Sequence, residues 1–316
     1  MPPDAILVVD KPRGPTSRQV AEAVRRVAGA GKAGHAGTLD PISTGVLVVC
    51  LGRGTLLSGY LAGGGKEYLV SALMGVETET YDTDGEITAR GDTTGLSREE
   101  TEASFDCLLG HILQKPPMYS AVKHKGKPLH RYARSGIKVE VEPRLVEVKS
   151  IELVSLVRDG SELRAGLKVV CGPGTYIRSL VHEIGGKLGC GACVEELRRT
   201  RSGRFGIEGA PTLDRLSSAE PEEIAEFITS LEDATAWFPT VVVNKEGMSG
   251  VGAGKQLLAR WINESGGEVE KGEVFRVLDR RGQLLALYGP PRESDGDGTV
   301  GRAVRVIRPV TLEERE

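Results

Sequence analysis

The sequence predicts an α+β protein of two domains, a larger one at residues 1–238 and a smaller β-rich one at residues 239–316. In the larger part, apolar runs typical of strands are interspersed with segments of helical periodicity. An acidic stretch with helical character, 220–237, is followed by Pro239, which marks the expected boundary. Beyond it, short β-like runs are separated by Gly and Asp clusters, as is typical of a small β domain.

The amino-terminal elements are expected to alternate between strand and helix. Residues 5–9 form an apolar run typical of a buried strand, and Thr16 or Ser17 can cap the helix that follows. In that helix valines recur at helical spacing. The next expected elements are a strand at 46–51, a short helix at 55–61 and a strand at 66–74.

Further along, Ser97 and Glu100 form a capping-box pattern, which predicts a helix running to about Leu109. The other elements expected in the larger domain are a polar loop at 78–85, a short helical stretch at 129–135, strands at 145–157 and 163–171, and a helix at 175–188 ended by Gly189. In the smaller domain, β-like runs lie at 241–243, 274–278, 284–288 and 304–307.

Composition indicates a soluble protein of the cytoplasm. The 316 residues are 39% hydrophobic and 27% charged, and no apolar run approaches the length of a membrane-spanning helix. The amino terminus lacks the basic and apolar regions of a signal peptide. Five cysteines, an odd number without a regular framework, suit a reducing compartment.

A net charge of −3 conceals a strongly cationic segment. Between residues 115 and 138 there is no acid, and Tyr119 and Tyr132 lie among the cations. The seven cations are Lys115, Lys123, Lys125, Lys127, Arg131, Arg134 and Lys138. A second basic run comprises Arg198, Arg199, Arg201 and Arg204. Such local concentration predicts a surface that binds phosphates although the whole chain is acidic.

The sequence is organised around the glycine-rich stretch 34–47, which contains Asp40 followed by Pro41. Proline disfavours helical backbone in its predecessor, so the carboxylate is expected to be held in a defined direction. Taken alone, the same dipeptide favours a helix start, with Asp as the cap and Pro in the first turn. The residues by themselves leave both interpretations open.

The full stretch GHAGTLDPISTGVL resembles the catalytic-aspartate motif of pseudouridine synthases, in the version of the bacterial tRNA pseudouridine-55 synthase family. Asp40 matches the catalytic aspartate. The resemblance extends over about residues 5–216. KEY matches the segment that supplies the active-site tyrosine, here Tyr68, and GTYIR the one that carries the active-site arginine, here Arg178.

Other matched positions are expected to bind the substrate. Lys11 lies in the motif VDKP, Leu197 in LRRT, and Asp82 matches an acid joined to the active-site network. His35 resembles the family histidine that occupies the space vacated by the flipped nucleotide. The segment 111–140 resembles the insertion that grips tRNA, and it contains Tyr119, Lys123 and Arg134.

The resemblance implies a pseudouridine-synthase fold, with a central mixed, largely antiparallel sheet flanked by helices and a PUA-like RNA-binding domain at the carboxyl end. The implied reaction breaks the N1–C1′ bond of a uridine at position 55, in the T loop of tRNA, turns the base and rejoins it through C5. That reaction requires no metal, redox cofactor or nucleotide cofactor. The expected partner is the T stem-loop, with no membrane, and the enzyme is expected to act as a monomer.

Two features do not support other chemistry. Residues 29–34 match GxGxxG formally, but they follow a helix and open none, so a dinucleotide site is not predicted. Cys190 and Cys193 form a single CxxC, which is weak evidence for zinc, and both thiols are interpreted as structural.

Two alternatives from other functional classes stay open. One is a non-catalytic protein that binds or folds tRNA, although binding alone does not need Asp40, Tyr68 and Arg178 together. The other is a guide-RNA-dependent pseudouridine synthase, which the insertion at 111–140 disfavours. A glycosidase is not supported, because no second catalytic carboxylate is evident.

Overall fold

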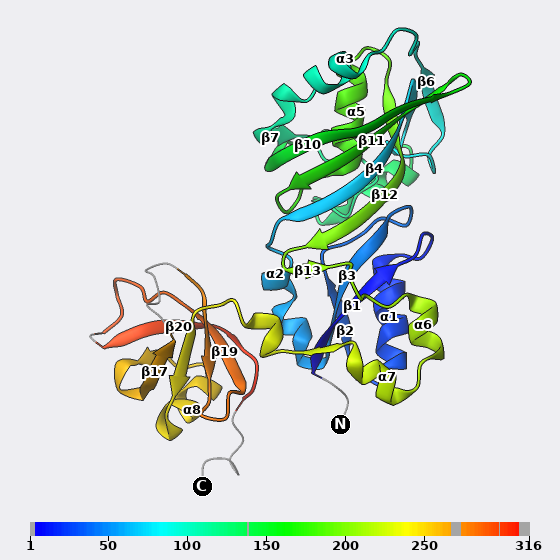
Figure 1. The fold of residues 1–316 in the computed structure, drawn as a ribbon. Helices are drawn as coiled ribbons and strands as arrows, with labels where there is room; N and C mark the ends of the chain where they lie inside the picture. Colours follow the sequence, from blue (N-terminus) through cyan, green and yellow to red (C-terminus); the bar gives the residue numbers. More distant parts are fainter. Residues whose placement is uncertain (1–3, 138, 267–272, 297, 310–316) are drawn as a thin grey trace.

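The computed structural model describes residues 4–137, 139–266, 273–296 and 298–309. Lys138, the last cation of the predicted basic run, lies outside these ranges. The described chain forms one large sheet flanked by helices and a smaller, β-rich part at the carboxyl end (Figure 1). The predicted α+β class is therefore confirmed.

The large sheet is mixed but mostly antiparallel, as expected. Along it, β3 and β12 are the parallel neighbours, through the pairs Arg198–Thr44 and Arg199–Gly45. Short strands β2 (Ala33–Ala36) and β13 (Phe205–Gly206) pair with β3 and β12. The order across the sheet is β14 (Ile228–Ser230), β1 (Ala5–Lys11), β3 (Thr44–Leu51), β12 (Ala192–Ser202), β4 (Lys66–Met74), β11 (Glu162–Cys171), β10 (Arg144–Asp159) and β7 (Gly110–Gln114).

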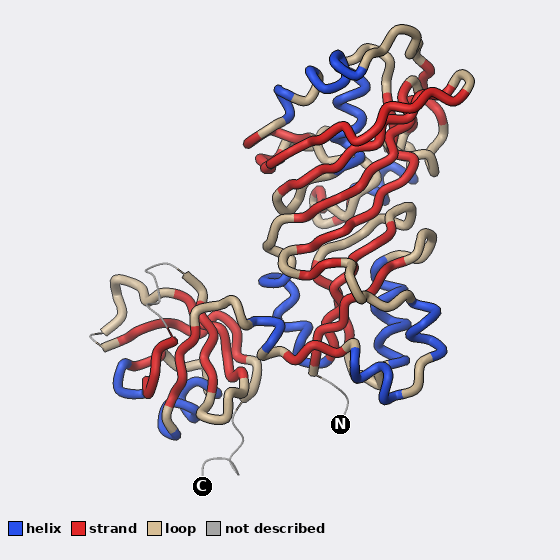
Figure 2. The backbone as a smooth tube through the Cα atoms, in the orientation of Figure 1, coloured by secondary structure: helices blue, strands red, loops and turns tan. Residues whose placement is uncertain are grey.

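Helices cover the large sheet in two groups, at its lower and upper ends in Figure 2. Near β1–β3 lie α1 (Ser17–Val27), α6 (Leu213–Ser218) and α7 (Pro221–Glu226), and at the other end lie α3 (Arg98–Ala103) and α5 (Ile177–Lys187). The capping box of α1 uses Thr16 and Gln19, and its buried valines contact the sheet core. Burial of such apolar faces against the sheet stabilises both layers.

Two expected helices are shorter than the periodicity suggested. The capping box at Ser97 is present, but α3 ends at Ala103 and a 3-10 turn, Asp106–Leu108, follows. The helix expected at 220–237 was wrong over most of its length, because the only helical segments there are α7 and a 3-10 turn, Asp233–Thr235. Residues 228–230 instead pair with β1 as the edge strand β14, so tertiary pairing outweighs local propensity there.

The remaining short elements lie in the connections. The helix expected at 55–61 is a 3-10 turn, Gly52–Leu57, followed by α2 (Ser58–Leu61). After β4 come the paired strands β5 (Val76–Thr78) and β6 (Ile87–Arg90). The cationic segment forms β8 (Lys123–His124), β9 (Lys127–Pro128) and α4 (Leu129–Arg134), with Leu129 buried beneath them.

The carboxyl-terminal part is a six-stranded sheet with its own core. Its strand order is β16 (Leu257–Leu258), β20 (Thr299–Val306), β19 (Leu284–Gly289), β18 (Phe275–Leu278), β15 (Thr240–Val243) and β17 (Ile262–Gly266), with α8 (Lys245–Gly252) packed beside it. Leu284 and Leu287 also join a cluster with Ile6 and Val46 of the large sheet. A continuous apolar contact therefore links the two parts. No helix in the described ranges is long and apolar enough to cross a membrane.

Candidate active site

Asp40 lies in the tight connection between β2 and β3. The amide of Ser43 donates to the carbonyl of Asp40 at 3.0 Å, and the amide of Gly14 donates to the carbonyl of Pro41 at 2.8 Å. Leu39 is buried, with its backbone bonded to the hydroxyl of Ser17. Residues 38–43, all of them described, contain no helix. The helix-cap interpretation of Asp40 is therefore wrong, and a fixed turn presents its carboxylate.

Two fully buried cations hold this loop from beneath. Lys11 donates to the carbonyls of Pro12 and Ser43 at 2.9 and 2.7 Å, and lies 3.4 Å from that of Pro41. Arg199 likewise donates to carbonyls, those of Val46, Thr38 and Gly37, at 2.8, 3.3 and 3.0 Å. Each cation thus exchanges water for backbone oxygens, which fixes the loop and satisfies the buried charge.

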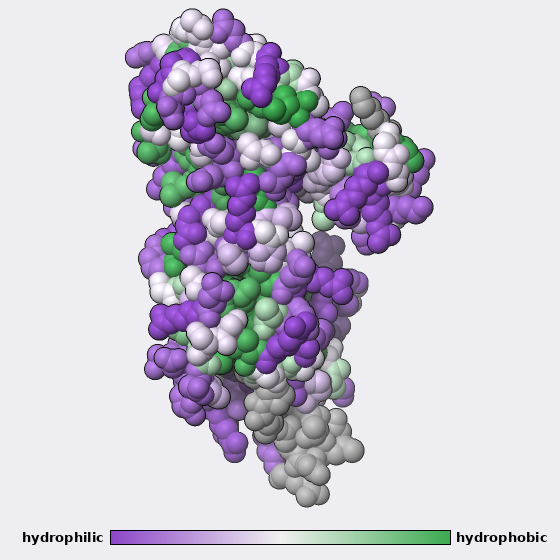
Figure 3. Space-filling view, turned by 90° about the vertical axis from the view of Figure 1, so that its right-hand side faces the viewer, coloured by the Kyte–Doolittle hydropathy of each residue, from purple (hydrophilic) through white to green (hydrophobic). Residues whose placement is uncertain are grey.

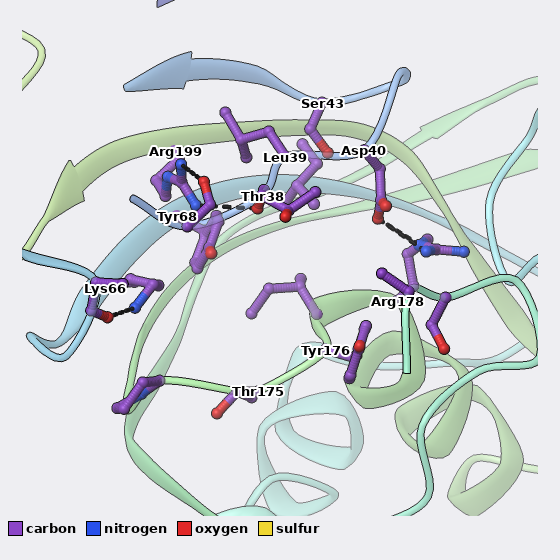
Figure 4. A pocket seen from close by; sticks show the side chains of 18 residues that line it. Thr38, Leu39, Asp40, Ser43, Lys66, Tyr68, Thr175, Tyr176, Arg178 and Arg199 are labelled. Atoms are coloured by element: carbon purple, nitrogen blue, oxygen red, sulfur yellow. Dashed lines mark hydrogen bonds and ion pairs between the residues drawn. The ribbon is translucent and has the colours of Figure 1, made fainter. Parts of the chain in front are cut away.

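Arg178 pairs with Asp40 at one side of the pocket (Figure 4). Its Nε donates to Oδ2 of Asp40 at 2.9 Å, and its Nη2 lies 2.8 Å from the same oxygen. The side chain of Arg178 is 4% exposed and that of Asp40 is 34% exposed. The pair is thus formed through one carboxylate oxygen, Oδ2. Oδ1 of Asp40 has no hydrogen-bond donor among the described residues.

The loop 79–82 and the segment 111–140 fix the orientation of the Arg178 guanidinium. Its Nη1 donates to the carbonyl of Thr80 at 2.7 Å, and its Nη2 donates to the carbonyl of Tyr119 at 2.9 Å. The carboxylate of Asp82 lies 3.5 Å from Nη1 and accepts from the hydroxyl of Thr80 at 2.6 Å. Burial raises the pKa of Asp82, although Thr80 and Arg178 act in the opposite direction. These contacts leave Arg178 one orientation.

A cavity of about 330 Å³ opens beside the Asp40–Arg178 pair, within the range of small-ligand sites. Tyr68 from β4 and Leu197 from β12 form part of its apolar wall, and both side chains are 6% exposed. Tyr68 points into it from the side opposite Arg178 (Figure 4). The lining also includes Thr38, Ser43, Lys66, Ser120, Thr175, Tyr176 and Ile177. An aromatic ring, an aliphatic wall and one carboxylate therefore surround a space fit for a flat polar base.

Burial shapes the proton affinities around this cavity. It raises the pKa of Tyr68, so the phenol is neutral near pH 7. It lowers the pKa of Lys66, whose ammonium donates to the carbonyls of Ala62 and Gly64. It also lowers the pKa of Lys11 to about 8, with repulsion from Arg199 adding to the effect and attraction by Asp40 opposing it. Asp40 therefore faces a wall that supplies no second anion.

The sequence-predicted residues fall into three groups. Asp40, Tyr68, Arg178 and Leu197 line the cavity. Asp82 and Tyr119 contact Arg178 without lining it. His35, Lys11, Lys123 and Arg134 are outside the lining.

Each residue of the third group has a distinct place. Lys11 is fully buried beneath the loop, with its protons directed to carbonyls, so it is a loop support and cannot meet a ligand there. His35 lies on β2, and its Nδ1 is buried without a described partner. Lys123 and Arg134 are exposed on β8 and α4. They can contact only a ligand larger than the cavity.

Several residues that shape the site gave no clear signal in the sequence. Tyr176 lines the cavity, and its backbone amide and carbonyl are both bonded to the buried side chain of Gln114, at 2.8 and 3.1 Å. Gln114 lies 62 positions away, on the edge strand β7. Arg199 was visible only as one member of a basic run. Its position on a central strand, where alternation buries every second side chain, could have indicated a buried role.

No group of three or more His, Cys, Asp or Glu side chains among the described residues is arranged to hold a metal ion. The CxxC cysteines are both buried and free of disulfides. Burial raises the pKa of Cys190 and, aided by nearby Asp82 and Glu195, that of Cys193 to about 11. Both thiols are thus protonated near neutral pH and pack as small core residues.

Comparison with known proteins now bears on this geometry. The family model described as TruB family pseudouridylate synthase (N terminal domain) matches residues 25–177, and that described as tRNA pseudouridylate synthase B C-terminal domain matches 178–235. A curated relative from Saccharophagus degradans, named tRNA pseudouridine synthase B, is 38% identical over 95% of this chain and 94% of its own length. The chain belongs to the TruB family of pseudouridylate synthases. It is accordingly an isomerase.

Other matches agree with membership of the TruB family. A tRNA pseudouridine synthase B from Stutzerimonas stutzeri is 45% identical over 72% of each chain. The solved archaeal box H/ACA sRNP Nop10–Cbf5 complex matches with a TM-score of 0.72 and 27% identity, over 99% of this chain and 88% of that one. An H/ACA RNP bound to a substrate RNA containing 2′-deoxyuridine matches with a TM-score of 0.70 and 26% identity, over 97% and 86%. These likenesses cover both parts of this TruB-family fold.

Proposed function

We propose that this protein isomerises uridine to pseudouridine at position 55, in the T loop of tRNA. The observation that carries the proposal is the Asp40–Arg178 pair at the wall of a cavity that also holds Tyr68 and Leu197. The motif resemblance and the relatives named tRNA pseudouridine synthase B support tRNA as the substrate. The T-loop position rests on the motif resemblance.

The chemistry assigned to the site rearranges one nucleotide and adds no atoms. The N1–C1′ bond breaks, the base turns within the cavity, and a C5–C1′ bond forms. The hydrogen on C5 then leaves, and N1 takes up a proton. Oδ1 of Asp40 is the oxygen directed to the sugar, because Oδ2 is held by two nitrogens of Arg178. Either attack on C1′ or removal of a sugar proton suits a carboxylate in that position.

Tyr68 is assigned to the base. Its ring offers a flat face for stacking on uracil, a contact of about 1–3 kcal/mol in nucleic-acid sites. Its hydroxyl does not act as a phenolate near pH 7, so it can only relay the C5 proton after reattachment, taking that proton up as its own proton passes to a base. The roles of Asp40 and Tyr68 are thus separate: one acts at the sugar and one at the base.

Extrusion of the base from an RNA loop costs on the order of a few kcal/mol. The cationic segment that contains Lys123 and Arg134 can supply compensating contacts to phosphates. Figure 3 shows a face on which hydrophilic residues are mixed with hydrophobic ones, and a lobe with a hydrophilic lower part that projects in the upper half of the molecule. Tyr119 connects this segment to the catalytic pair, since its carbonyl accepts from Arg178.

We also propose that the enzyme acts as a monomer in the cytoplasm. Every residue assigned to the cavity comes from one chain, so no second copy is required. All five cysteines are free thiols, which suits a reducing compartment.

Tritium release from tRNA transcribed with 5-³H-uridine tests the reaction. The wild-type protein is expected to release tritium from that tRNA, and a transcript with cytidine at position 55 is expected to release little. Asp40→Asn should reduce release at least 1,000-fold, because it removes the reacting charge. Asp84→Asn is the matched control, since Asp84 is a half-exposed carboxylate paired with Arg13, outside the cavity. Full activity of Asp40→Asn would refute the assignment.

A guide-dependent synthase is the second candidate, favoured by the structural likeness to H/ACA proteins. The free chain acting on tRNA without added RNA would exclude it. A protein that only binds or folds tRNA would give binding with steep salt dependence and no tritium release. The same assay therefore separates all three possibilities.

A further inference from the structure

A second cavity lies next to the catalytic one, and neither the motifs nor the family match assigns it a role. Its volume is about 450 Å³. Lys66, the first residue of β4, lines both cavities. Beyond Lys66 the cavities lie on opposite faces of the sheet, because Glu67 and Arg201 of the second alternate with Tyr68 and Arg199 of the first. The two cavities therefore meet around the turn 62–66. The second cavity is bounded by α2, the β12–β13 turn and the segment leading to the carboxyl-terminal part. Figure 1 shows these elements meeting at the junction of the two parts.

Aromatic side chains are concentrated at this junction. The chain has 14 aromatic residues, and four of them gather here: Tyr60, Phe205, Trp237 and Phe238. The ring of Phe205 meets that of Trp237 edge-on at 6.1 Å, and Phe238 lies 5.5 Å from Trp237. These contacts anchor the interdomain segment, and they leave Trp237 half-buried on the wall of the cavity.

The charges of this cavity favour an anion. The guanidinium of Arg204 lies over the indole of Trp237, 5.6 Å from its centroid. Arg201 is exposed beside it. Neither arginine has a carboxylate within 4.0 Å in the described part of the chain. Glu67 is the acid in the lining, and it is engaged by the hydroxyl of Thr200 at 2.8 Å and by Lys168 at 3.3 Å. It also lies opposite Arg201 in the β4–β12 pairing, and the charge of Arg201 helps to lower the pKa of Glu67.

Backbone packing keeps the two cavities close together. A Cβ at Gly64 would lie 2.5 Å from the Cα of Gly203, so the turn 62–66 can press against the β12–β13 turn only without a side chain there. The amide of Gly203 donates to the carbonyl of Gly65 at 2.7 Å. The turn 62–66 is therefore held in place at the point where the two cavities meet, and a ligand that reaches both passes around this turn.

We propose that this second cavity binds one nucleotide of single-stranded RNA, a neighbour of the uridine held in the catalytic cavity. The base stacks on the Arg204–Trp237 pair, and a phosphate pairs with Arg201. Stacking on aromatic and guanidinium faces together with cationic backbone contacts is the usual way in which proteins hold single strands. This inference rests on the proposed function, because it takes RNA as the substrate.

The test measures binding of a T stem-loop RNA to the full-length protein over a range of salt concentrations. Arg201→Gln combined with Arg204→Gln should weaken binding about tenfold at 0.1 M salt and lower the slope of log K against log salt by about 1–2. Arg90→Gln is the matched control, since Arg90 is an exposed arginine of β6, at the far end of the large sheet. Unchanged affinity and slope in the double variant would overturn the proposal.

A second readout does not depend on removing charge. The chain has two tryptophans, and Trp261 is buried in the carboxyl-terminal core, so the difference between wild type and Trp237→Phe isolates the signal of Trp237. Stem-loop RNA should quench that signal, whereas uridine monophosphate alone at equal concentration should quench it far less. Equal quenching by the mononucleotide would replace the RNA assignment with a free-nucleotide site. If the wild type instead bound RNA as described and released no tritium, the proposed reaction would fail while this site stood.

Discussion

Arg178→Lys tests whether orientation, beyond charge, makes Asp40 reactive. The guanidinium meets three partners at once, Asp40 and the carbonyls of Thr80 and Tyr119, at 2.7–2.9 Å. A lysine ammonium keeps the charge but occupies one point, so at least one partly buried carbonyl loses its donor at about 1–3 kcal/mol. We expect a total loss of about 2–4 kcal/mol in unfolding free energy. Because natural domains hold about 5–15 kcal/mol, the variant should still fold.

The catalytic effect should exceed the loss of stability. A carboxylate displaced by about 1 Å from its reactive position can lose on the order of 100-fold in rate. We therefore expect kcat for tritium release to fall about 100-fold, while the Kd for stem-loop RNA changes less than threefold. Arg198→Lys is the matched control, since Arg198 grips Asp10 through two bonds of 3.0 and 2.7 Å outside the catalytic cavity. A kcat for Arg178→Lys within tenfold of wild type would refute the reasoning.

Three further substitutions probe the supports of the site. Gly45→Ala should lower the free energy of unfolding in urea by about 3 kcal/mol or more, because φ of Gly45 is +98° and the new Cβ would lie 2.1 Å from a carbonyl oxygen. Gly29→Ala should lower it by only about 1 kcal/mol, because φ of Gly29 is +62° and no atom lies within 4 Å of the new Cβ. Equal costs at the two glycines would contradict this. Lys11 should lose a proton around pH 8, which leaves an amine with two hydrogens for three carbonyl oxygens. We therefore expect kcat to fall between pH 7 and pH 9 in the wild type and to stay level in Lys11→Arg. Parallel pH–rate profiles of the two proteins would contradict this role of Lys11. Gln114→Ala removes the two hydrogen bonds between this side chain and the backbone of Tyr176, just before α5, so it should lower both Tm and kcat. An unchanged Tm would show that these hydrogen bonds do not contribute to stability.

Local signals predicted most of the fold. The strands at 46–51, 66–74 and 163–171 and the helix at 175–188 appear within a few residues of the expected bounds, because each has strong periodicity and a turn or glycine at its end. Strand β12 was not predicted, although it has eleven residues and lies in the middle of the large sheet, because its Glu and Arg residues interrupt the apolar pattern. Strands β2, β7 and β14 were not predicted either. Each has three to five residues and exists through pairing with a distant partner, which a local pattern does not encode.

The site was predictable where a residue's chemistry was visible in its motif. Asp40, Tyr68 and Arg178 were expected together, and they line one cavity. Lys11 was expected at the substrate and instead lies beneath the loop, because a buried ammonium needs oxygen partners and the loop supplies its carbonyls. Gln114 gave no signal, since its role depends on the pairing of β7 with β10.

Strand β12 sets a limit on when this enzyme can first act. Its two consecutive arginines lie on opposite faces of the strand. Arg198 is partly exposed at the surface, while Arg199 is fully buried beneath the Asp40 turn. A shift of one residue in the pairing of β12 would bury Arg198 and expose Arg199. The Asp40 turn is therefore supported by Arg199 only once this strand has paired in the correct register. Because β12 ends at Ser202 of 316 residues, a nascent chain still on the ribosome must emerge for roughly two thirds of its length before it can modify any RNA.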